Sequence, residues 1–154
     1  MDGDRILSVF AALAREKVRY KVIGGVALNL HGIIRATEDL DLFVAPDEEN
    51  VHRLRSALRA VFQDPHIDEI TSADLAGDYP AVQYVPPEGE GWIDLLARLG
   101  TAFAFDDVEA EEKVVEGTPV LVATPRMLYR MKKDTVRPQD HADAARLRER
   151  FGLE

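Results

Sequence analysis

Two aspartates in one apolar segment are the residues of this sequence best suited to chemistry. Asp39 and Asp41 alternate with Leu40 and Leu42, so in a β-strand both carboxylates point to one face. Their Cα atoms would lie about 7 Å apart, which lets both side chains reach the same divalent cation. Because neighbouring anions repel each other, a bound cation would stabilise this pair. The pattern therefore predicts a metal site.

A pair of glycines precedes the aspartates, at the point where an apolar segment gives way to a short helical one. Gly24 and Gly25 have no Cβ atom, so backbone N–H groups there could approach a phosphate closely. An isolated glycine pair is more often only a tight turn, and an isolated Asp-x-Asp is common on exposed strands. Their occurrence in consecutive elements favours a site for Mg²⁺ and a nucleoside triphosphate.

A third carboxylate, Asp94, interrupts the apolar segment 92–96. A charge among buried side chains is costly, so its presence needs a reason. Strand alternation allows Asp94 to be an ordinary surface residue. The alternative is a carboxylate triad that holds two Mg²⁺ ions across a reacting phosphate. Magnesium takes oxygen ligands and keeps several waters, so three carboxylates and the phosphate oxygens suffice.

The overall composition limits the class of protein. The chain has 154 residues, of which 46% are hydrophobic and 31% charged, and it has no cysteine. These values predict one globular domain, 1–154, without disulfides or thiolate metal ligands. The formal net charge of −9 argues against broad nucleic-acid binding. No apolar run is long enough to span a bilayer and the N-terminus is unlike a signal peptide, so we expect a cytoplasmic protein without a membrane partner.

The elements that would position the site follow from hydrophobic spacing and capping residues. Helices are expected over 4–17 and 26–31, and a third is capped by Asp47 and carries Val51, Leu54, Leu58 and Phe62; two more begin at Thr124-Pro125 and Arg137-Pro138. Strands are expected over 20–23, 40–44, 81–85 and 92–96, with a late hairpin of 113–115 and 120–122 around Gly117-Thr118. Between 64 and 77 the pattern assigns no element. This order predicts an α+β (α/β) fold, with a mixed β-sheet flanked by helices in a core over 1–123 and a C-terminal helical pair over 124–154.

The spacing of the glycines and aspartates resembles that of a known superfamily. An apolar strand, Gly24-Gly25, a gap of thirteen residues and then Asp39-x-Asp41 are similar to the signature of polymerase-β-type nucleotidyltransferases. In that superfamily a later strand supplies a third acidic residue, and Asp94 is the natural match. The resemblance implies the nucleotidyltransferase fold.

The residues between the two motifs resemble one branch of this superfamily, the AbiEii-like or minimal nucleotidyltransferases. The residues that carry this resemblance are Gly24–Ala27, His31-Gly32, Arg35, Thr37 and Asp39–Asp41. The branch includes stand-alone bacterial nucleotidyltransferases found in toxin–antitoxin systems. It implies a possible partner protein from such a pair.

The C-terminal part of the chain is similar to a second motif of the same branch. Lys132, Arg137-Pro138, Asp140 and Asp143 follow its order of a lysine, an arginine and two aspartates. In that branch the lysine and the first aspartate belong to the active site, which implies this role for Lys132 and Asp140. From the residues alone, Lys132 could instead be the solvated edge of an amphipathic helix, and Asp140 the partner of a helix dipole.

Several other side chains have a structural alternative. Arg35 could bind phosphate oxygens or pair with Glu38 or Asp39. Thr37 could only shape the entry to the strand. His31 is expected to be structural. Two aromatic residues, Trp92 and Tyr84, are expected to pack in the core, although either could stack on a base.

Together these residues and the family resemblance predict an Mg²⁺-dependent nucleotidyltransferase, an enzyme of the phosphotransferase class that moves a nucleoside monophosphate from an NTP to a hydroxyl of a protein, tRNA or small molecule. The predicted site residues are the catalytic and metal-binding Asp39, Asp41 and Asp94, the catalytic Lys132, and the nucleotide-binding Gly24, Gly25, Arg35, Thr37 and Asp140. The alternative is a non-catalytic module with this fold, such as an antitoxin acting on a partner protein.

Overall fold

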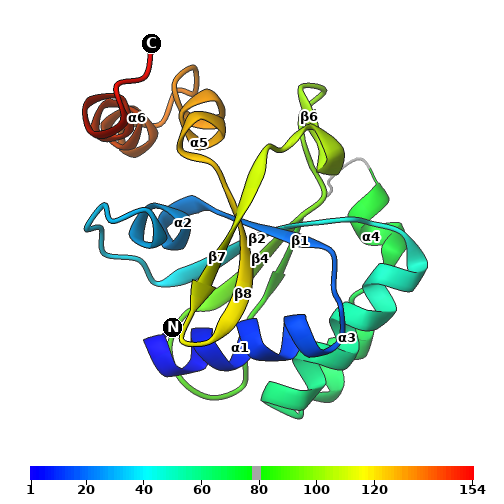
Figure 1. Ribbon diagram of the computed structural model, residues 1–154. Coiled ribbons are helices and arrows are strands. Elements are labelled where there is room, and N and C mark those ends of the chain that lie inside the picture. The colour runs from blue at the N-terminus through cyan, green and yellow to red at the C-terminus, as the bar shows by residue number, and fades with distance from the viewer. Residues whose placement is uncertain (78–80) are drawn as a thin grey trace.

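A six-stranded mixed sheet forms the centre of the protein in a computed structural model that describes residues 1–77 and 81–154 (Figure 1). The strand order is β3-β4-β2-β1-β8-β7, with β2–β4 and β1–β8 parallel and the other pairs antiparallel. The strands are β1 (Tyr20–Ile23), β2 (Asp39–Val44), β3 (Ala81–Tyr84), β4 (Trp92–Leu96), β7 (Ala110–Val115) and β8 (Thr118–Ala123). A separate pair is formed by β5 (Arg98–Leu99) and β6 (Phe103–Ala104).

Helices flank this sheet, as the sequence predicts. They are α1 (Gly3–Arg15), α2 (Gly24–Leu30), α3 (Glu48–Phe62), α4 (Ser72–Ala76), α5 (Pro125–Lys132) and α6 (Pro138–Phe151), with 3₁₀ turns η1 (Pro65–Glu69) and η2 (Phe105–Asp107). Helices α1 and α3 pack against each other along one side of the sheet, whereas α5 and α6 pack together on the side where α2 lies (Figure 1). In the described residues, no helix combines the length and apolar character needed to cross a membrane.

Local signals in the sequence account for most helix starts. The side chain of Asp47 accepts a hydrogen bond from the Asn50 amide at the start of α3, and Thr124 does the same for Met127 at the start of α5. Proline occupies the first turn of both α5 and α6, where a missing N–H costs nothing. The predicted starts of these helices are therefore confirmed.

The register of the central strands determines which side chains meet. Strand β2 pairs with β4 so that Asp41 lies beside Asp94 and Asp39 beside Trp92. Strand β1 ends at Ile23, which is the partner of Asp41 in the antiparallel pair with β2. Because β1 ends there, α2 begins next to Asp41.

Several details differ from the sequence prediction. The late hairpin turns at Glu116 and Gly117, both with positive φ, so Thr118 is already in β8. The segment 64–77, left unassigned, contains η1 and α4, which begin after the capping side chains of Asp64 and Thr71. Strands β5 and β6 were not predicted, because each has only two residues and no pattern to detect.

Candidate active site

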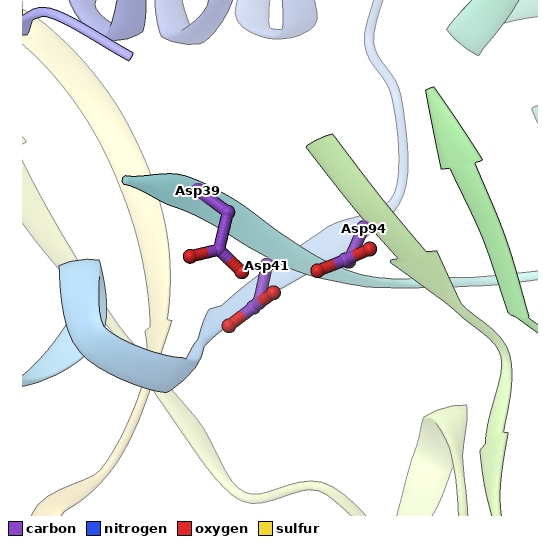
Figure 2. A group of neighbouring side chains, drawn as sticks. All are labelled: Asp39, Asp41 and Asp94. Carbon is purple, nitrogen blue, oxygen red and sulfur yellow. The ribbon is translucent and has the colours of Figure 1, made fainter. Parts of the chain in front are cut away.

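Three carboxylates converge on one face of the sheet (Figure 2). Asp39, Asp41 and Asp94 each offer one oxygen, and these oxygens lie within 4.8 Å of one another. Asp39 and Asp41 share a face because they are two residues apart in β2, and the parallel register with β4 brings Asp94 next to Asp41. All three side chains are partly buried, whereas Leu40 and Leu42 on the other face of β2 are fully buried.

The closeness of these carboxylates changes their protonation. Burial, followed by the charge of Asp39 and the hydrogen-bonding contact with Asp94, raises the pKa of Asp41 to about 8. Burial and the neighbouring Asp94 also raise the pKa of Asp39. Both shifts mean that the site disfavours its own ionised form. A cation would reverse this, so the cluster could bind a divalent metal ion through its oxygen ligands.

The two glycines are in direct contact with site residues. Gly24 has a φ of +68°, and a Cβ atom on it would collide with the carboxylate of Asp41. A Cβ atom on Gly25 would collide with the Arg35 guanidinium and lie 3.0 Å from the Thr37 hydroxyl oxygen. The close approach of these side chains therefore requires glycine at both positions. The sequence had suggested a different reason for the glycines, the access of a phosphate to the backbone.

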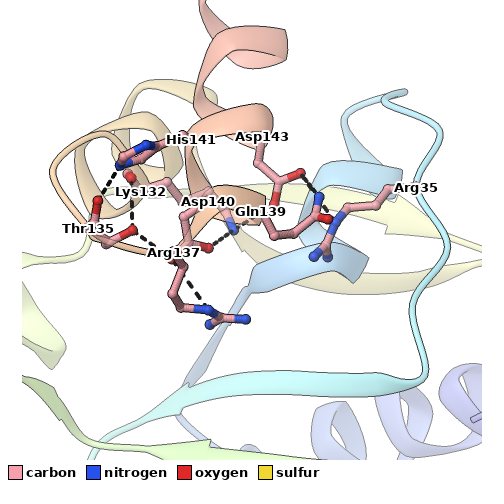
Figure 3. Close-up of polar contacts among 8 residues, drawn as sticks. All are labelled: Arg35, Lys132, Thr135, Arg137, Gln139, Asp140, His141 and Asp143. Atoms are coloured by element: carbon pink, nitrogen blue, oxygen red, sulfur yellow. Dashed lines mark hydrogen bonds and ion pairs between the residues drawn. The ribbon is translucent and has the colours of Figure 1, made fainter.

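Lys132 belongs to a buried polar network between α5 and α6 (Figure 3). Its ammonium group donates to Asp143 Oδ2 at 3.1 Å and to Asp140 Oδ1 at 3.4 Å. Thr135 Oγ1 donates to the other oxygen of Asp140 at 2.9 Å, and Gln139 Nε2 donates to Asp143 Oδ1 at 3.1 Å. Lys132 is only 9% exposed, so its interpretation as a solvated helix edge is wrong.

Arg35 pairs with a residue that the sequence argument did not consider. Its Nε lies 3.2 Å from Asp143 Oδ1, so among the described residues its ion-pair partner is Asp143 rather than Glu38 or Asp39 (Figure 3). Thr37 donates from Oγ1 to the backbone carbonyl of Asp39 at 2.9 Å. This hydrogen bond supports the interpretation that Thr37 shapes the entry to β2.

A pocket of about 330 Å³ connects the carboxylates to the C-terminal helices. Five of the predicted site residues line it: Gly24, Asp41, Asp94, Lys132 and Asp140. Its remaining wall includes the apolar side chains of Leu99, Leu128 and Met131. The other four predicted residues, Gly25, Arg35, Thr37 and Asp39, do not line this pocket. Asp39 belongs to the triad, Arg35 pairs with Asp143, and Gly25 lies against Arg35 and Thr37.

The sequence did not predict the contacts that two residues, Trp92 and Asp143, make with the site. Trp92, expected in the core, is partly buried and donates from Nε1 to Asp94 Oδ2 at 3.0 Å. Its spacing of two residues from Asp94 in a strand was the available signal. Asp143 was recognised as part of a motif but had no assigned partner. Tyr84, in contrast, is buried as expected and donates to Asp64 at 2.8 Å.

His31 has a structural role, as expected. Its ring is buried, and Nε2 lies 2.8 Å from the carbonyl oxygen of Ala123 at the end of β8. This contact ties the end of α2 to the sheet. Burial lowers the pKa of His31, which favours the neutral ring.

Comparison with known proteins identifies the family. A family model described as "Nucleotidyl transferase AbiEii toxin, Type IV TA system" matches residues 5–93. The chain belongs to this AbiEii family. It is therefore a nucleotidyltransferase related to toxin–antitoxin systems, as the sequence resemblance implied. The matched region contains both glycines and the first two aspartates and ends one residue before Asp94.

Solved structures share the fold of this AbiEii-family protein at low sequence identity. An antigenic nucleotidyltransferase-like protein from Paracoccidioides brasiliensis has a TM-score of 0.56 and 15% identity, over 96% of this chain and 77% of its own. ANT(2'')-Ia, in complex with adenylyl-2''-tobramycin, has a TM-score of 0.53 and 17% identity, over 96% of this chain and 87% of its own. No curated protein matches the sequence. The predicted nucleotidyltransferase fold is thus confirmed.

Proposed function

We propose that the protein is an Mg²⁺-dependent nucleotidyltransferase that moves a nucleoside monophosphate from an NTP to a hydroxyl acceptor. The observation that carries this proposal is the convergence of Asp39, Asp41 and Asp94 within 4.8 Å, in contact with Gly24. The whole chain, 1–154, acts as one domain. Its core, 1–123, supplies the carboxylates and glycines, and its C-terminal helices, 124–154, supply Lys132.

The carboxylates are the ligands of two Mg²⁺ ions in this proposal. Three observations support a hard divalent cation: the ligands are all oxygens, they lie close together, and the pKa of Asp41 is raised to about 8 by burial and like charge. When bound, such ions neutralise triphosphate oxygens and polarise the α-phosphate for attack.

The triphosphate lies against the glycine pair. Gly24 and Gly25 leave backbone N–H groups at the start of α2 open to phosphate oxygens. The Nε of Arg35 is paired with Asp143, and its Nη1 lies over Gly25, which places the guanidinium beside the same oxygens. Thr37 supports this arrangement through its hydrogen bond to Asp39.

In the reaction, the acceptor hydroxyl oxygen forms a bond to the α-phosphorus. The bond from that phosphorus to the oxygen shared with the β-phosphate breaks, and pyrophosphate leaves with the bonding electrons. Asp94 takes the proton of the hydroxyl. Lys132, held by Asp140 at the wall of the pocket, offsets the developing negative charge. Positioning and charge neutralisation supply the catalysis.

The acceptor is a hydroxyl of a protein, a tRNA or a small molecule. ANT(2'')-Ia, which has a similar fold, is known in complex with adenylyl-2''-tobramycin. Unmodified tobramycin, bulk tRNA and the protein itself are the three acceptors to offer first.

The test is transfer of label from each of the four α-³²P-NTPs, with Mg²⁺ or with EDTA. We expect wild type to label an acceptor only with Mg²⁺, and Asp41→Asn to lose this labelling. Asp106→Asn is the matched control, because Asp106 is exposed and lies outside the site, so its labelling should equal that of wild type. Labelling by Asp41→Asn at the wild-type rate, or in EDTA, would refute the proposal.

A further inference from the structure

Trp92 lies on the same face of the sheet as the three carboxylates. It is two residues before Asp94 in β4, and the register with β2 makes it the neighbour of Asp39. Its indole Nε1 donates to Asp94 Oδ2 at 3.0 Å. The side chain is partly buried, and the ring thus stands beside the carboxylates rather than in the core.

The chemistry of the indole determines which residue donates in the hydrogen bond between Trp92 and Asp94. The indole N–H is only a donor, so Asp94 is the acceptor of this hydrogen bond. It engages Oδ2 and leaves Oδ1 free to act as a ligand. Carboxylates that bind metal ions are commonly oriented in this way by a hydrogen bond from a neighbouring group.

Asp94 has a particular need for such a partner. Asp39 and Asp41 come from one strand, and Asp41 is further confined by the backbone of Gly24. Asp94 comes from a different strand and faces two like-charged neighbours, which disfavour a fixed position close to them. The Trp92 N–H opposes this repulsion at the third carboxylate.

We propose that Trp92 is a positioning residue whose indole N–H holds Asp94 in the orientation that binds the divalent cation, and whose ring reports occupation of that site. The inference rests on the proposed function, since it assumes that the triad binds a cation. A residue that only packs would tolerate replacement by phenylalanine without any change in cation affinity.

Direct binding of Mn²⁺, a paramagnetic substitute for Mg²⁺, tests this inference without any reaction. Electron paramagnetic resonance measures free Mn²⁺, and hence the Kd, for wild type, Trp92→Phe and Tyr84→Phe. Tyr84→Phe is the matched control, because it also deletes one aromatic donor but its partner is Asp64, outside the triad. We expect Trp92→Phe to raise the Kd about 10- to 100-fold and Tyr84→Phe to leave it unchanged.

The emission of Trp92 gives a second, independent measurement. Trp92 is the single tryptophan of the chain, so all indole fluorescence comes from beside Asp94. Titration with Mg²⁺ should shift the emission of wild type with a saturating dependence. The same titration of Asp94→Asn should leave the emission unchanged.

The outcomes separate this inference from the proposal on which it rests. If wild type and Trp92→Phe bind Mn²⁺ equally well, the positioning role is wrong and the metal-dependent function stands. If wild type binds no Mn²⁺ at all, both are overturned. Circular dichroism of each variant ensures that a loss of affinity is not a loss of folding.

Discussion

Arg35 and Asp143 form an ion pair that joins the loop between α2 and β2 to helix α6, with 3.2 Å between Nε and Oδ1 (Figure 3). The Asp143 side chain is fully buried, and its second oxygen accepts from Lys132 at 3.1 Å. The Asp143 carboxylate therefore binds two cationic side chains, those of Arg35 and Lys132, from distant parts of the chain. Because Arg35 lies beside Gly25, this ion pair attaches helix α6 to the part of the site that contains the glycine pair.

Replacement of Asp143 by alanine should strongly destabilise the fold. It leaves Lys132 and Arg35 without their shared partner, and loss of one member of a buried ion pair costs about 3–5 kcal/mol. Urea denaturation followed by circular dichroism measures the free energy of unfolding. Asp134→Ala is the control, because Asp134 pairs with Lys133 at 3.8 Å in an exposed position and should change stability by less than about 0.5 kcal/mol. Similar values for the two variants would contradict the role of Asp143.

Gly24→Ala should abolish nucleotidyl transfer in a protein that still folds. The new Cβ atom would displace the carboxylate of Asp41 and would also strain a backbone with φ of +68°. Gly117→Ala separates the two effects, because Gly117 has φ of +81° but no atom within 4 Å of the added Cβ. Both variants should lose about 1 kcal/mol or more of stability from backbone strain. Only Gly24→Ala should lose labelling, and equal activity in the two would show that Asp41 is not displaced.

The sequence predicted those parts of the fold that depend on local signals. The alternation around Asp39 and Asp41 gave their shared face, and caps such as Asp47 and Thr124 gave the starts of helices. Asp94 was predicted to be the third carboxylate because it interrupts an apolar strand and matches the superfamily pattern. The segment 64–77 has caps of the same kind, Asp64 and Thr71, but each starts an element of only five residues, which is too short for its apolar residues to show a helical period.

The partners of the site residues were not predictable in the same way. Arg35 has acidic neighbours in the sequence, yet it pairs with Asp143, which only the packing of α6 brings near. A long side chain can reach several acids, and the sequence does not say which of them will be buried. Trp92 was judged by its size and apolar character, whereas its N–H and its register beside Asp39 determine its contact.

Two adjacent lysines allow a test of the role proposed for Lys132. Lys132→Met replaces the aliphatic stem of the side chain by one of similar length and removes the ammonium charge at the pocket wall. We expect labelling to fall by at least about 100-fold, the loss typical when a group that stabilises transition-state charge is removed. Lys133→Met should retain wild-type activity, because Lys133 contacts only Asp134 among the ion pairs of the described residues.

Stability must be measured beside activity for these lysine variants. Lys132→Met leaves Asp140 and Asp143 without their shared cation, so it should also lower the free energy of unfolding. Assays well below the midpoint of thermal unfolding keep the variant folded. Full labelling by folded Lys132→Met would assign Lys132 a structural role only.

Without a bound cation, the protein should become less stable as the pH rises. Burial and the charge of Asp39 raise the pKa of Asp41 from 3.8 to about 8 in the folded state. Between these values the folded protein binds a proton that the unfolded chain has lost, so the free energy of unfolding falls across this range. Urea denaturation of EDTA-treated protein across that range measures the slope, and Asp41→Asn should flatten it. A slope that is as steep in Asp41→Asn would place the responsible proton on another group.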